Sequence, residues 1–473
     1  MLLNEALNLS FHQPEVDFLI PNVDEDLRIY VDPFLFYKSE NPEFLAVHAT
    51  IRKYFDIAIS QIKNGKEEIA KRMMVFPEVK ETMLGLSKNS HKGRGLGHIR
   101  GEIIYKEIVS NKDILKYGIS HLAEMQVLIY GVEFDLVSDM CTNIAKHFFV
   151  DYTQRQCLLH DIKMEKGICL THVFDWQELD WDDIHTDLPL NPHNEQPMLF
   201  VPKVVIRRFS EINYKDFWTT IYRYILRDIE ISRSIQSIGR KPKITWKEID
   251  KKYNFSKKKV VEVLHEDYQL LGKYIRKKES IRLENLKKIN LLDIEGTDKK
   301  ATPIENLISG LKELKVGKAD CRKYESIMVK ILTRLFSPML SDPHRNVQTV
   351  DGREVIDITF YNSANHSFWF DIKNKYGNVI IVFELKNMTD LGNEEYFQIS
   401  ARLNEKNGKF GILISRDKDN LDIQRAYRRY NNEGKVILNL TDDDIINMLT
   451  SIKDGISPII YLTKIYRKFI EEA

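Results

Sequence analysis

The sequence predicts a multidomain α+β protein with a mixed N-terminal domain, a small basic helical module and a C-terminal α/β domain. The chain has 473 residues, of which 43% are hydrophobic and 29% charged, which suits about three globular domains. Basic charge is concentrated in residues 241–300. This segment contains 17 Lys and Arg and 10 Asp and Glu, a net charge of +7, whereas the whole chain has a net charge of +1. From about residue 304, short apolar runs alternate with helical patterns, which indicates an α/β sheet.

The composition also excludes several classes of protein. A disordered or fibrous chain would have fewer apolar residues. No apolar run approaches the roughly 18 residues of a membrane span, and the N-terminus lacks the pattern of a signal peptide. The four cysteines are too few and too scattered for a disulfide framework. We therefore expect a cytoplasmic protein without a membrane partner.

Residues 1–215 are predicted to form the mixed N-terminal domain. Short apolar runs there alternate with helical patterns over 114–129 and 137–150. A Gly-rich stretch, 85–97, contains Lys92 and Arg94 and is predicted as a loop, either a plain surface loop or one whose basic side chains touch a nucleic-acid backbone. The first 200 residues resemble no family of known activity.

Residues 216–291 are predicted to form the basic module. Thr245 with Glu248 makes a capping box that begins one short helix, and Ser256 can cap a second helix that opens with Lys257, Lys258 and Lys259. Two short helices joined by a tight turn resemble a winged helix-turn-helix. The three lysines are candidates for binding DNA phosphates, and the alternative is a solvated helix face. Residues 292–303 are polar with Gly and Pro, and are predicted as a linker.

Residues 304–473 are predicted to form the C-terminal α/β domain. The expected helices are 324–336, 394–405, 422–431 and 442–449, and the expected strands are 355–361, 379–385, 410–415 and 436–439.

Charged residues interrupt two of these apolar strands. Asp357 stands within Val355 to Ile358, and Glu384 and Lys386 stand at the end of the next strand. A buried carboxylate costs several kcal/mol unless it is compensated. Because strand residues alternate, Glu384 and Lys386 share one face. If Asp357 faces them, the two carboxylates can hold a hard divalent cation, most plausibly Mg²⁺ with Mn²⁺ as the alternative. The alternative is that Glu384 and Lys386 simply end an edge strand and pair with their neighbours.

The order of motifs resembles the PD-(D/E)xK superfamily of restriction-endonuclease-like enzymes. The similarity covers roughly residues 318–450 and rests on 352–362, 368–370, 382–387, Gln398 and 408–416. One departure is that Ile356 stands where the motif's name places a proline before the first acid.

This resemblance implies a restriction-endonuclease-like core with metal-dependent phosphodiesterase activity. It implies that Asp357 and Glu384 are metal ligands and that Lys386 is the catalytic lysine. Glu325, on the helix before the first strand, is at the place of an accessory acid, and Gln398, on the helix after the lysine, is at the place of a supporting group.

The spacing of Cys157, His160, Cys169 and His172 offers four ligands of the types that zinc takes. The gap of eight residues between the pairs is shorter than in zinc fingers, and the cysteines have apolar neighbours, which favours a role in packing.

Together these observations predict a Mg²⁺-dependent endonuclease that cuts DNA. By resemblance, such layouts occur in bacterial restriction and anti-phage defence and in selfish elements, with a second copy or a defence-system protein as partner. Two alternatives stay open: a nuclease acting on RNA or single strands, and an inert DNA-binding regulator with a nuclease-like fold.

Overall fold

The computed structural model describes residues 1–39, 41–85, 93–238, 243–281, 304–348, 355–365, 367–417, 430 and 433–472. The chain divides into two compact units. The first, here called the sheet unit, combines residues 1–20, 155–163 and 291–473. The second, the helical unit, combines residues 21–154 and 164–290. The predicted scheme placed all of 1–215 in one domain, whereas two of its segments pack with the C-terminal part of the chain.

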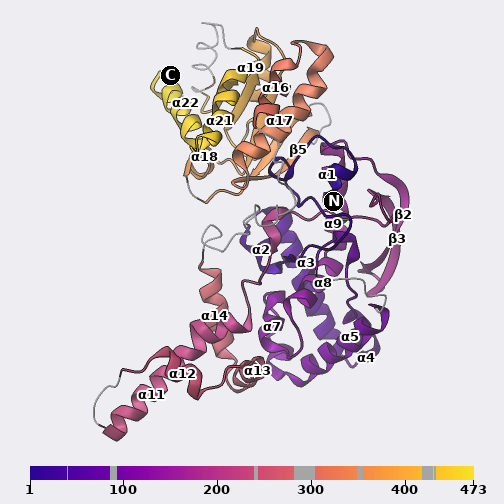
Figure 1. Cartoon of the computed structure of the whole chain (residues 1–473), viewed down its shortest axis with the longest axis vertical. Helices are drawn as coiled ribbons and strands as arrows, with labels where there is room; N and C mark the ends of the chain where they lie inside the picture. Colours follow the sequence, from indigo (N-terminus) through magenta and orange to yellow (C-terminus); the bar gives the residue numbers. More distant parts are fainter. Residues whose placement is uncertain are drawn as a thin grey trace. The chain divides into compact units, whose positions relative to one another are not determined.

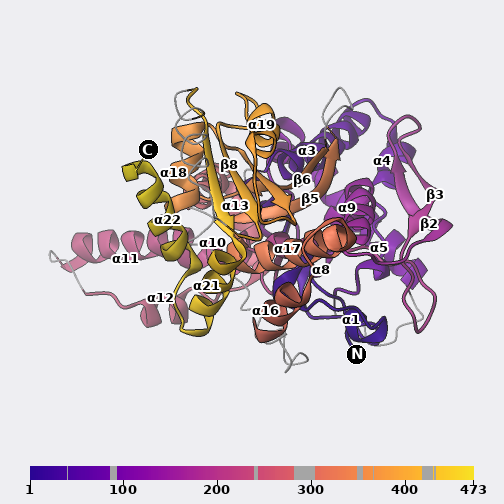
Figure 2. The ribbon, with the colours of Figure 1, turned by 90° about the horizontal axis from the view of Figure 1, so that it is seen from above.

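The sheet unit is built on one five-stranded mixed sheet with the order β5-β6-β7-β8-β9 (Figure 2). The first three strands pair antiparallel, and β7, β8 and β9 pair parallel. The strands are β5 (Leu340–Gln348), β6 (Val355–Asn362), β7 (Ile380–Lys386), β8 (Phe410–Ser415) and β9 (Val436–Thr441). The helices are α1 (Leu3–Ala6), η1 (Gln13–Glu15), α16 (Ile304–Glu313), η7 (Lys318–Asp320), α17 (Cys321–Phe336), α18 (Ser367–Tyr376), α19 (Asn393–Arg402), α21 (Asp442–Lys453) and α22 (Pro458–Glu472).

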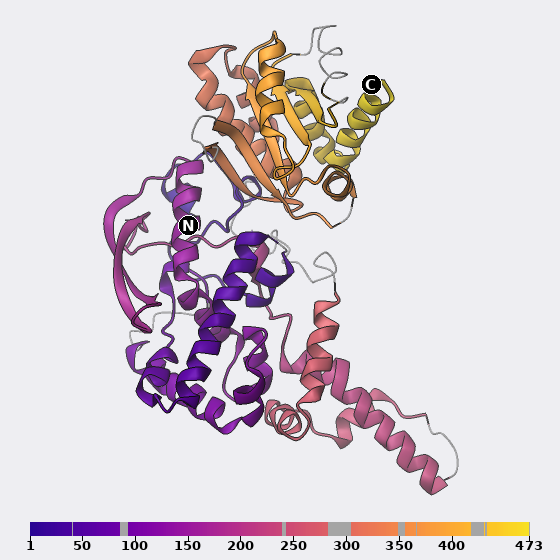
Figure 3. The same cartoon turned by 180° about the vertical axis from the view of Figure 1, so that it is seen from behind.

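Helices cover both faces of this sheet (Figures 1 and 3). On one face, Phe383 and Ile412 pack with α16, α17, α18, α21 and α22. On the other, Val382 and Leu413 pack with Tyr396 and Ile399 of α19. A Cβ on Gly411 would lie 3.0 Å from the side chains of Ile399 and Leu403, so the glycine lets α19 lie close to β8.

The structure confirms the predicted C-terminal strands within two residues at each end. The prediction missed strand β5 and helices α16, α18 and α22. Strand β5 reads Leu-Ser-Asp-Pro-His-Arg-Asn-Val-Gln, without the apolar run that marks a strand. The predicted helix 422–431 and the linker 292–303 lie outside the described residues, except for Tyr430.

The helical unit contains two small antiparallel strand pairs among its helices (Figure 1). Its strands are β1 (Tyr30–Val31) paired with β4 (Ile206–Arg207), and β2 (Glu165–Asp175) paired with β3 (Asp180–Leu188). Its helices before β2 are α2 (Pro33–Lys38), α3 (Pro42–Lys63), α4 (Glu67–Met73), η2 (Lys80–Thr82), α5 (Gly93–Ser110), α6 (Lys112–Tyr117), η3 (Leu122–Glu124), α7 (Met125–Leu128), α8 (Phe134–Ile144) and α9 (Lys146–Leu159), whose last turn belongs to the sheet unit.

Two predicted helical stretches in this unit are divided. The pattern over 114–129 is split between α6, η3 and α7, and the pattern over 137–150 between α8 and α9. The Gly-rich stretch was predicted as a loop, yet its last part, from Gly93, lies in α5.

The described part of the basic module consists of helices joined by short loops. After η4 (Lys203–Val205) and β4 come α10 (Tyr214–Phe217), η5 (Trp218–Tyr222), α11 (Arg223–Ile238), α12 (Trp246–Lys252), α13 (Lys257–Glu266) and α14 (Gln269–Glu279). Both predicted caps are confirmed: Glu248 N–H donates to Thr245 Oγ1 at 3.4 Å and Lys259 N–H donates to Ser256 Oγ at 3.2 Å. Within 243–281, α14 follows α13 and there is no strand.

No helix among these described residues is both long enough and apolar enough to cross a membrane.

A buried acid in the helical unit gives a prediction about pH. Glu124 is 3% exposed and accepts the backbone N–H of His121 at 3.1 Å. Burial raises the pKa of this carboxyl from 4.5 to about 8. The folded chain therefore keeps a proton that the unfolded chain loses, so the free energy of unfolding falls as the pH rises from about 5 to about 8.

In Glu124→Gln, the free energy of unfolding should change with pH by a few kcal/mol less than in wild type. The amide oxygen still accepts the hydrogen bond but cannot ionise. Urea unfolding of the full chain at several pH values measures it, with Glu68→Gln, 82% exposed, as the control. Equal slopes in wild type and Glu124→Gln would contradict the prediction.

Candidate active site

Two acids meet where strands β6 and β7 separate. The last backbone pair between these strands is Ile358 with Phe383, and one step further along the same register Asp357 lies opposite Glu384. The pairing ends there because Asp357 Oδ2 accepts the Leu385 N–H at 2.8 Å. Opposed residues of an antiparallel pair point to the same face, so both carboxylates face the side that α19 covers.

Lys386 joins this pair from the end of β7. Its Nζ lies 2.8 Å from Glu384 Oε1 and donates to Gln398 Oε1 on α19 at 2.7 Å. Side-chain alternation explains the first contact, since residues 384 and 386 share a face. The second contact depends on α19 packing over β7. The structure therefore brings Asp357, Glu384, Lys386 and Gln398 together.

Arg402 is a member of this cluster that the sequence did not indicate. It lies one helical turn after Gln398 on α19, so both side chains point toward the sheet. Its Nη1 forms an ion pair with Glu384 Oε2, and its Nη2 donates to the Val355 carbonyl. The spacing of four residues between Gln398 and Arg402 was the available signal. Glu384, 1% exposed, is thus held between two cations.

Glu325 is held by a different partner. It lies on α17, where its Oε2 accepts from Arg345 Nε at 3.2 Å and from Nη2 at 3.0 Å. The same guanidinium donates to Ser326 Oγ at 3.1 Å. The charge of Arg345 also acts on Asp357. Glu325 is therefore linked to Asp357 through a shared arginine, and within the described chain no contact joins it directly to Asp357 or Glu384.

A hydrogen-bonded network fixes the chain directly after Lys386. Asn387 Nδ2 donates to the carbonyls of Lys315 at 2.9 Å and Gly317 at 2.7 Å. Arg416 donates to Asn387 Oδ1 at 3.3 Å and its Nε lies 2.8 Å from Asp442 Oδ2. Burial raises the pKa of Asp442 to about 6. This network holds the end of β7, and with it the backbone that carries Lys386.

The donor set suits a hard divalent cation. Burial raises the pKa of the Asp357 carboxyl, while the Leu385 N–H and the charges of Lys386 and Arg402 oppose that rise. Asp357 Oδ1 has no hydrogen-bond partner among the described residues. Two carboxylates that supply only oxygen ligands, beside basic groups that compensate their charge, fit Mg²⁺ or Mn²⁺ better than the softer metals that prefer sulfur or imidazole.

The predicted nucleic-acid-binding lysines of the module differ in exposure. Lys257 is 8% exposed, and its Nζ lies 3.1 Å from Glu133 Oε1 and donates to the Val132 carbonyl. Its ammonium thus anchors α13 within the helical unit, contrary to the predicted phosphate contact. Lys258 and Lys259 are exposed. Lys92 lies outside the described residues, as does the side chain of Arg94.

Three of the four candidate zinc ligands are buried or pack against aromatic rings. His160 packs against the rings of Phe11 and Phe18 at 5.2 and 5.9 Å between centroids, and Cys157 is buried. In the helical unit, His172 stacks on Trp181 at 4.0 Å and its Nε2 lies 3.0 Å from the Val75 carbonyl oxygen. Cys169 is exposed. These contacts favour the packing interpretation.

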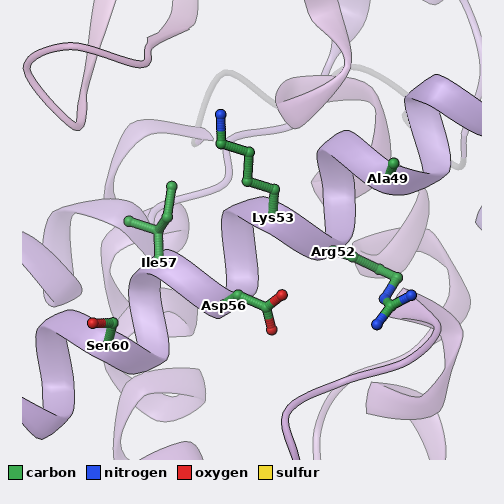
Figure 4. A pocket seen from close by; sticks show the side chains of 6 residues that line it. All are labelled: Ala49, Arg52, Lys53, Asp56, Ile57 and Ser60. Carbon is green, nitrogen blue, oxygen red and sulfur yellow. The ribbon is translucent and has the colours of Figure 1, made fainter.

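A pocket of about 390 Å³ lies along helix α3 in the helical unit (Figure 4). Arg52, Lys53 and Asp56 supply its charged side chains. All six lining residues come from this one helix, so the pocket is a depression on the surface of α3. No second helix or strand contributes to the lining of this pocket.

Comparison with known proteins gives two partial similarities. Residues 8–213 match a family described as a domain of unknown function, DUF8370. The chain is also similar to a putative transposon gamma-delta 80.3 kDa protein of Escherichia coli strain K12, with 25% identity over 173 residues. That alignment covers 35% of this chain and 24% of the relative. No solved structure matches the chain.

Proposed function

We propose that the sheet unit is a metal-dependent nuclease of the PD-(D/E)xK type that hydrolyses phosphodiester bonds of DNA. The observation that carries the proposal is the meeting of Asp357, Glu384 and Lys386 at the point where β6 and β7 separate. The order of elements supports it as well: α17 precedes three antiparallel strands, and α19 then connects β7 to the parallel strand β8.

The chemistry follows from the residues present. Asp357 and Glu384 would hold the cation, and a bound Mg²⁺ supplies charge to the phosphodiester and lowers the pKa of an attacking water. Lys386 places a positive charge beside the oxygen atoms that become more negative in the transition state. Gln398 accepts from the Lys386 ammonium and fixes its direction, so it is a positioning residue. Arg402 forms an ion pair with Glu384 and so compensates the charge of this buried carboxylate.

The experiment that tests this function uses the full-length chain with circular plasmid DNA, single-stranded DNA and RNA. We expect plasmid cleavage that requires Mg²⁺ or Mn²⁺ and stops with EDTA. Cleavage of RNA or single strands alone would support the alternative nuclease. Binding of DNA without cleavage of any substrate would favour the inert regulator.

A graded set of variants tests the assigned roles. Lys386→Ala should be nearly as damaging as loss of a carboxylate, because it removes charge from the reacting centre. Gln398→Ala should cost less, about tenfold, because Lys386 remains. Glu325→Ala should also give a partial loss. Cleavage rates at saturating DNA measure all three, and a Gln398→Ala variant as inactive as Lys386→Ala would contradict this ranking.

The basic module is proposed to help hold DNA through Lys258 and Lys259. Replacing both with Gln should weaken binding and lower the slope of log affinity against log salt by about 1 for each phosphate that the protein no longer neutralises. Lys257→Gln is the contrast, because its ammonium is already bound within the protein. It should reduce stability and leave the salt slope unchanged. An unchanged slope for the double variant would show that the two lysines are merely solvated.

The biological setting is proposed from the comparisons. The relative from Escherichia coli is described as a transposon protein. This supports a mobile element as the setting, beside restriction and anti-phage defence.

A further inference from the structure

Two adjoining pockets form a groove beside the candidate active site. Their volumes are about 480 and 610 Å³, and both are lined by Asp161, Arg322 and Arg345. Both lie entirely within the sheet unit, between the end of α9, the first turns of α17 and the edge strand β5. We call this surface the Arg322 groove.

The Arg322 groove is basic. Arg155, Arg322, Lys323, Lys330 and Arg345 line it, against the single acid Asp161. Acids compensate four of these five cations. Lys323 lies 2.9 Å from Asp320, Arg155 lies 3.7 Å from Asp342 and Arg345 lies 3.0 Å from Glu325, while the charges of Glu15 and Asp161 act on Lys330. Arg322 forms no ion pair within the described part of the chain, although it belongs to both pockets. A cation that lines a groove without an ion-pair partner favours an anionic ligand.

The groove leads to the paired carboxylates through strand β5. Arg345 lies opposite Ile358 in the β5–β6 register, and Ile358 is the neighbour of Asp357. The Arg345 guanidinium also binds Glu325. Arg345 thus lies on the sheet face that α17 covers, one strand from Asp357 and two from Glu384, and its charge acts on Asp357. The extended shape, over two connected pockets, suits a chain of anionic groups better than one small anion.

We propose that the Arg322 groove binds the sugar–phosphate backbone of the nucleic acid that the candidate active site cleaves. This inference rests on the proposed nuclease function and adds a place and direction for its substrate. It also gives a role to two segments far from the nuclease motifs. Asp161 and Arg155 come from residues 155–163, and Ser10, which accepts a hydrogen bond from Lys330 at 2.8 Å, comes from the first 20 residues.

The test compares two double variants of the full-length chain. Arg322→Gln with Lys323→Gln removes two charges from the groove. Lys406→Gln with Lys409→Gln removes two charges from the turn before β8, at the opposite end of the parallel strands from Lys386. Binding of fluorescent duplex DNA, single-stranded DNA and RNA of one sequence is measured in EDTA over a range of salt concentrations.

We expect the groove variant to bind duplex DNA with a salt slope lower by at least about 1, chiefly from Arg322 because Lys323 is already paired with Asp320, and the control variant to match wild type. A similar loss on all three nucleic acids supports recognition of the shared backbone, and a loss on one class identifies the substrate. Equal effects of the two double variants, or an unchanged slope, would overturn the inference. So would a wild-type chain that binds none of the three.

Cleavage separates this inference from the proposed function. With Mg²⁺, the groove variant should need more DNA to reach half-maximal rate and should keep its rate at saturation. If wild type binds DNA through the groove and cuts none of the substrates, the nuclease proposal fails while the binding site stands. If wild type cuts DNA and the groove variant matches it at every DNA concentration, the groove proposal fails alone.

Discussion

Glu384→Gln is expected to lower the rate of plasmid cleavage by roughly 1,000-fold or more. The carboxylate is buried at 1% exposure, and it faces Asp357 across the end of the β6–β7 pair. The amide has almost the same shape but no charge, so the cation loses a ligand and the reacting phosphodiester loses the charge of that cation. Asp357→Asn should lower the rate by a similar factor, because it also removes one charged ligand. The local structure should be kept, because the amide oxygen still accepts the Leu385 N–H.

Two measurements make this result specific. Titration calorimetry with Mn²⁺ should show binding to wild type and much weaker binding to either variant. Asp371→Asn on α18, an exposed acid of the same unit, should leave both properties unchanged. Cleavage at the wild-type rate by Asp357→Asn or Glu384→Gln would contradict the assignment of these acids as metal ligands.

Arg402→Met is expected to lower the free energy of unfolding by about 3–5 kcal/mol. The guanidinium is 9% exposed, and it is one of two cations bound to the buried carboxylate of Glu384. Removing one partner of a buried ion pair leaves the other poorly compensated, and this costs more than the pair itself contributes. Met retains much of the packing of the arginine stem. Urea unfolding of the full chain, followed by circular dichroism, measures the change.

The double variant Glu384→Gln with Arg402→Met tests that explanation. If the cost comes from an uncompensated carboxylate, removing its charge should restore much of the lost stability. Arg467→Met is the control, because Arg467 is 78% exposed and its ion pair within the described residues is with Glu471, one helical turn away. A double variant less stable than Arg402→Met would mean that the arginine acts through packing instead.

The candidate site shows what the sequence reveals and what it does not. Asp357, Glu384 and Lys386 were predictable because charged residues stand out within apolar strands, and alternation places 384 and 386 on one face. Arg402 was not predicted, because its contact with Glu384 depends on how α19 lies over β7. The spacing of four residues from Gln398 places Arg402 on the same helix face, but it does not show whether that arginine is buried or solvated.

The same limit explains the errors elsewhere. Strand β5 has Asp342, Pro343 and His344 near its start, and its strand character comes from pairing with β6 rather than from its own residues. Lys257 was predicted to be exposed because it begins a run of three lysines. Its burial depends on Glu133, which is 124 residues earlier in the chain. Local patterns carry no information about such distant partners.

The composition of the sheet unit has a consequence for the order in which the protein folds during its synthesis. Leu159 belongs to the same buried cluster as Phe383 and Leu440, and Ser10 bonds to Lys330. Residues 1–20 and 155–163 can therefore complete their packing only after most of the chain has been synthesised, because contacts between distant residues form late. The helical unit has most of its residues before 290 and can fold earlier. The candidate nuclease and the Arg322 groove are thus completed last, after the basic module of the helical unit.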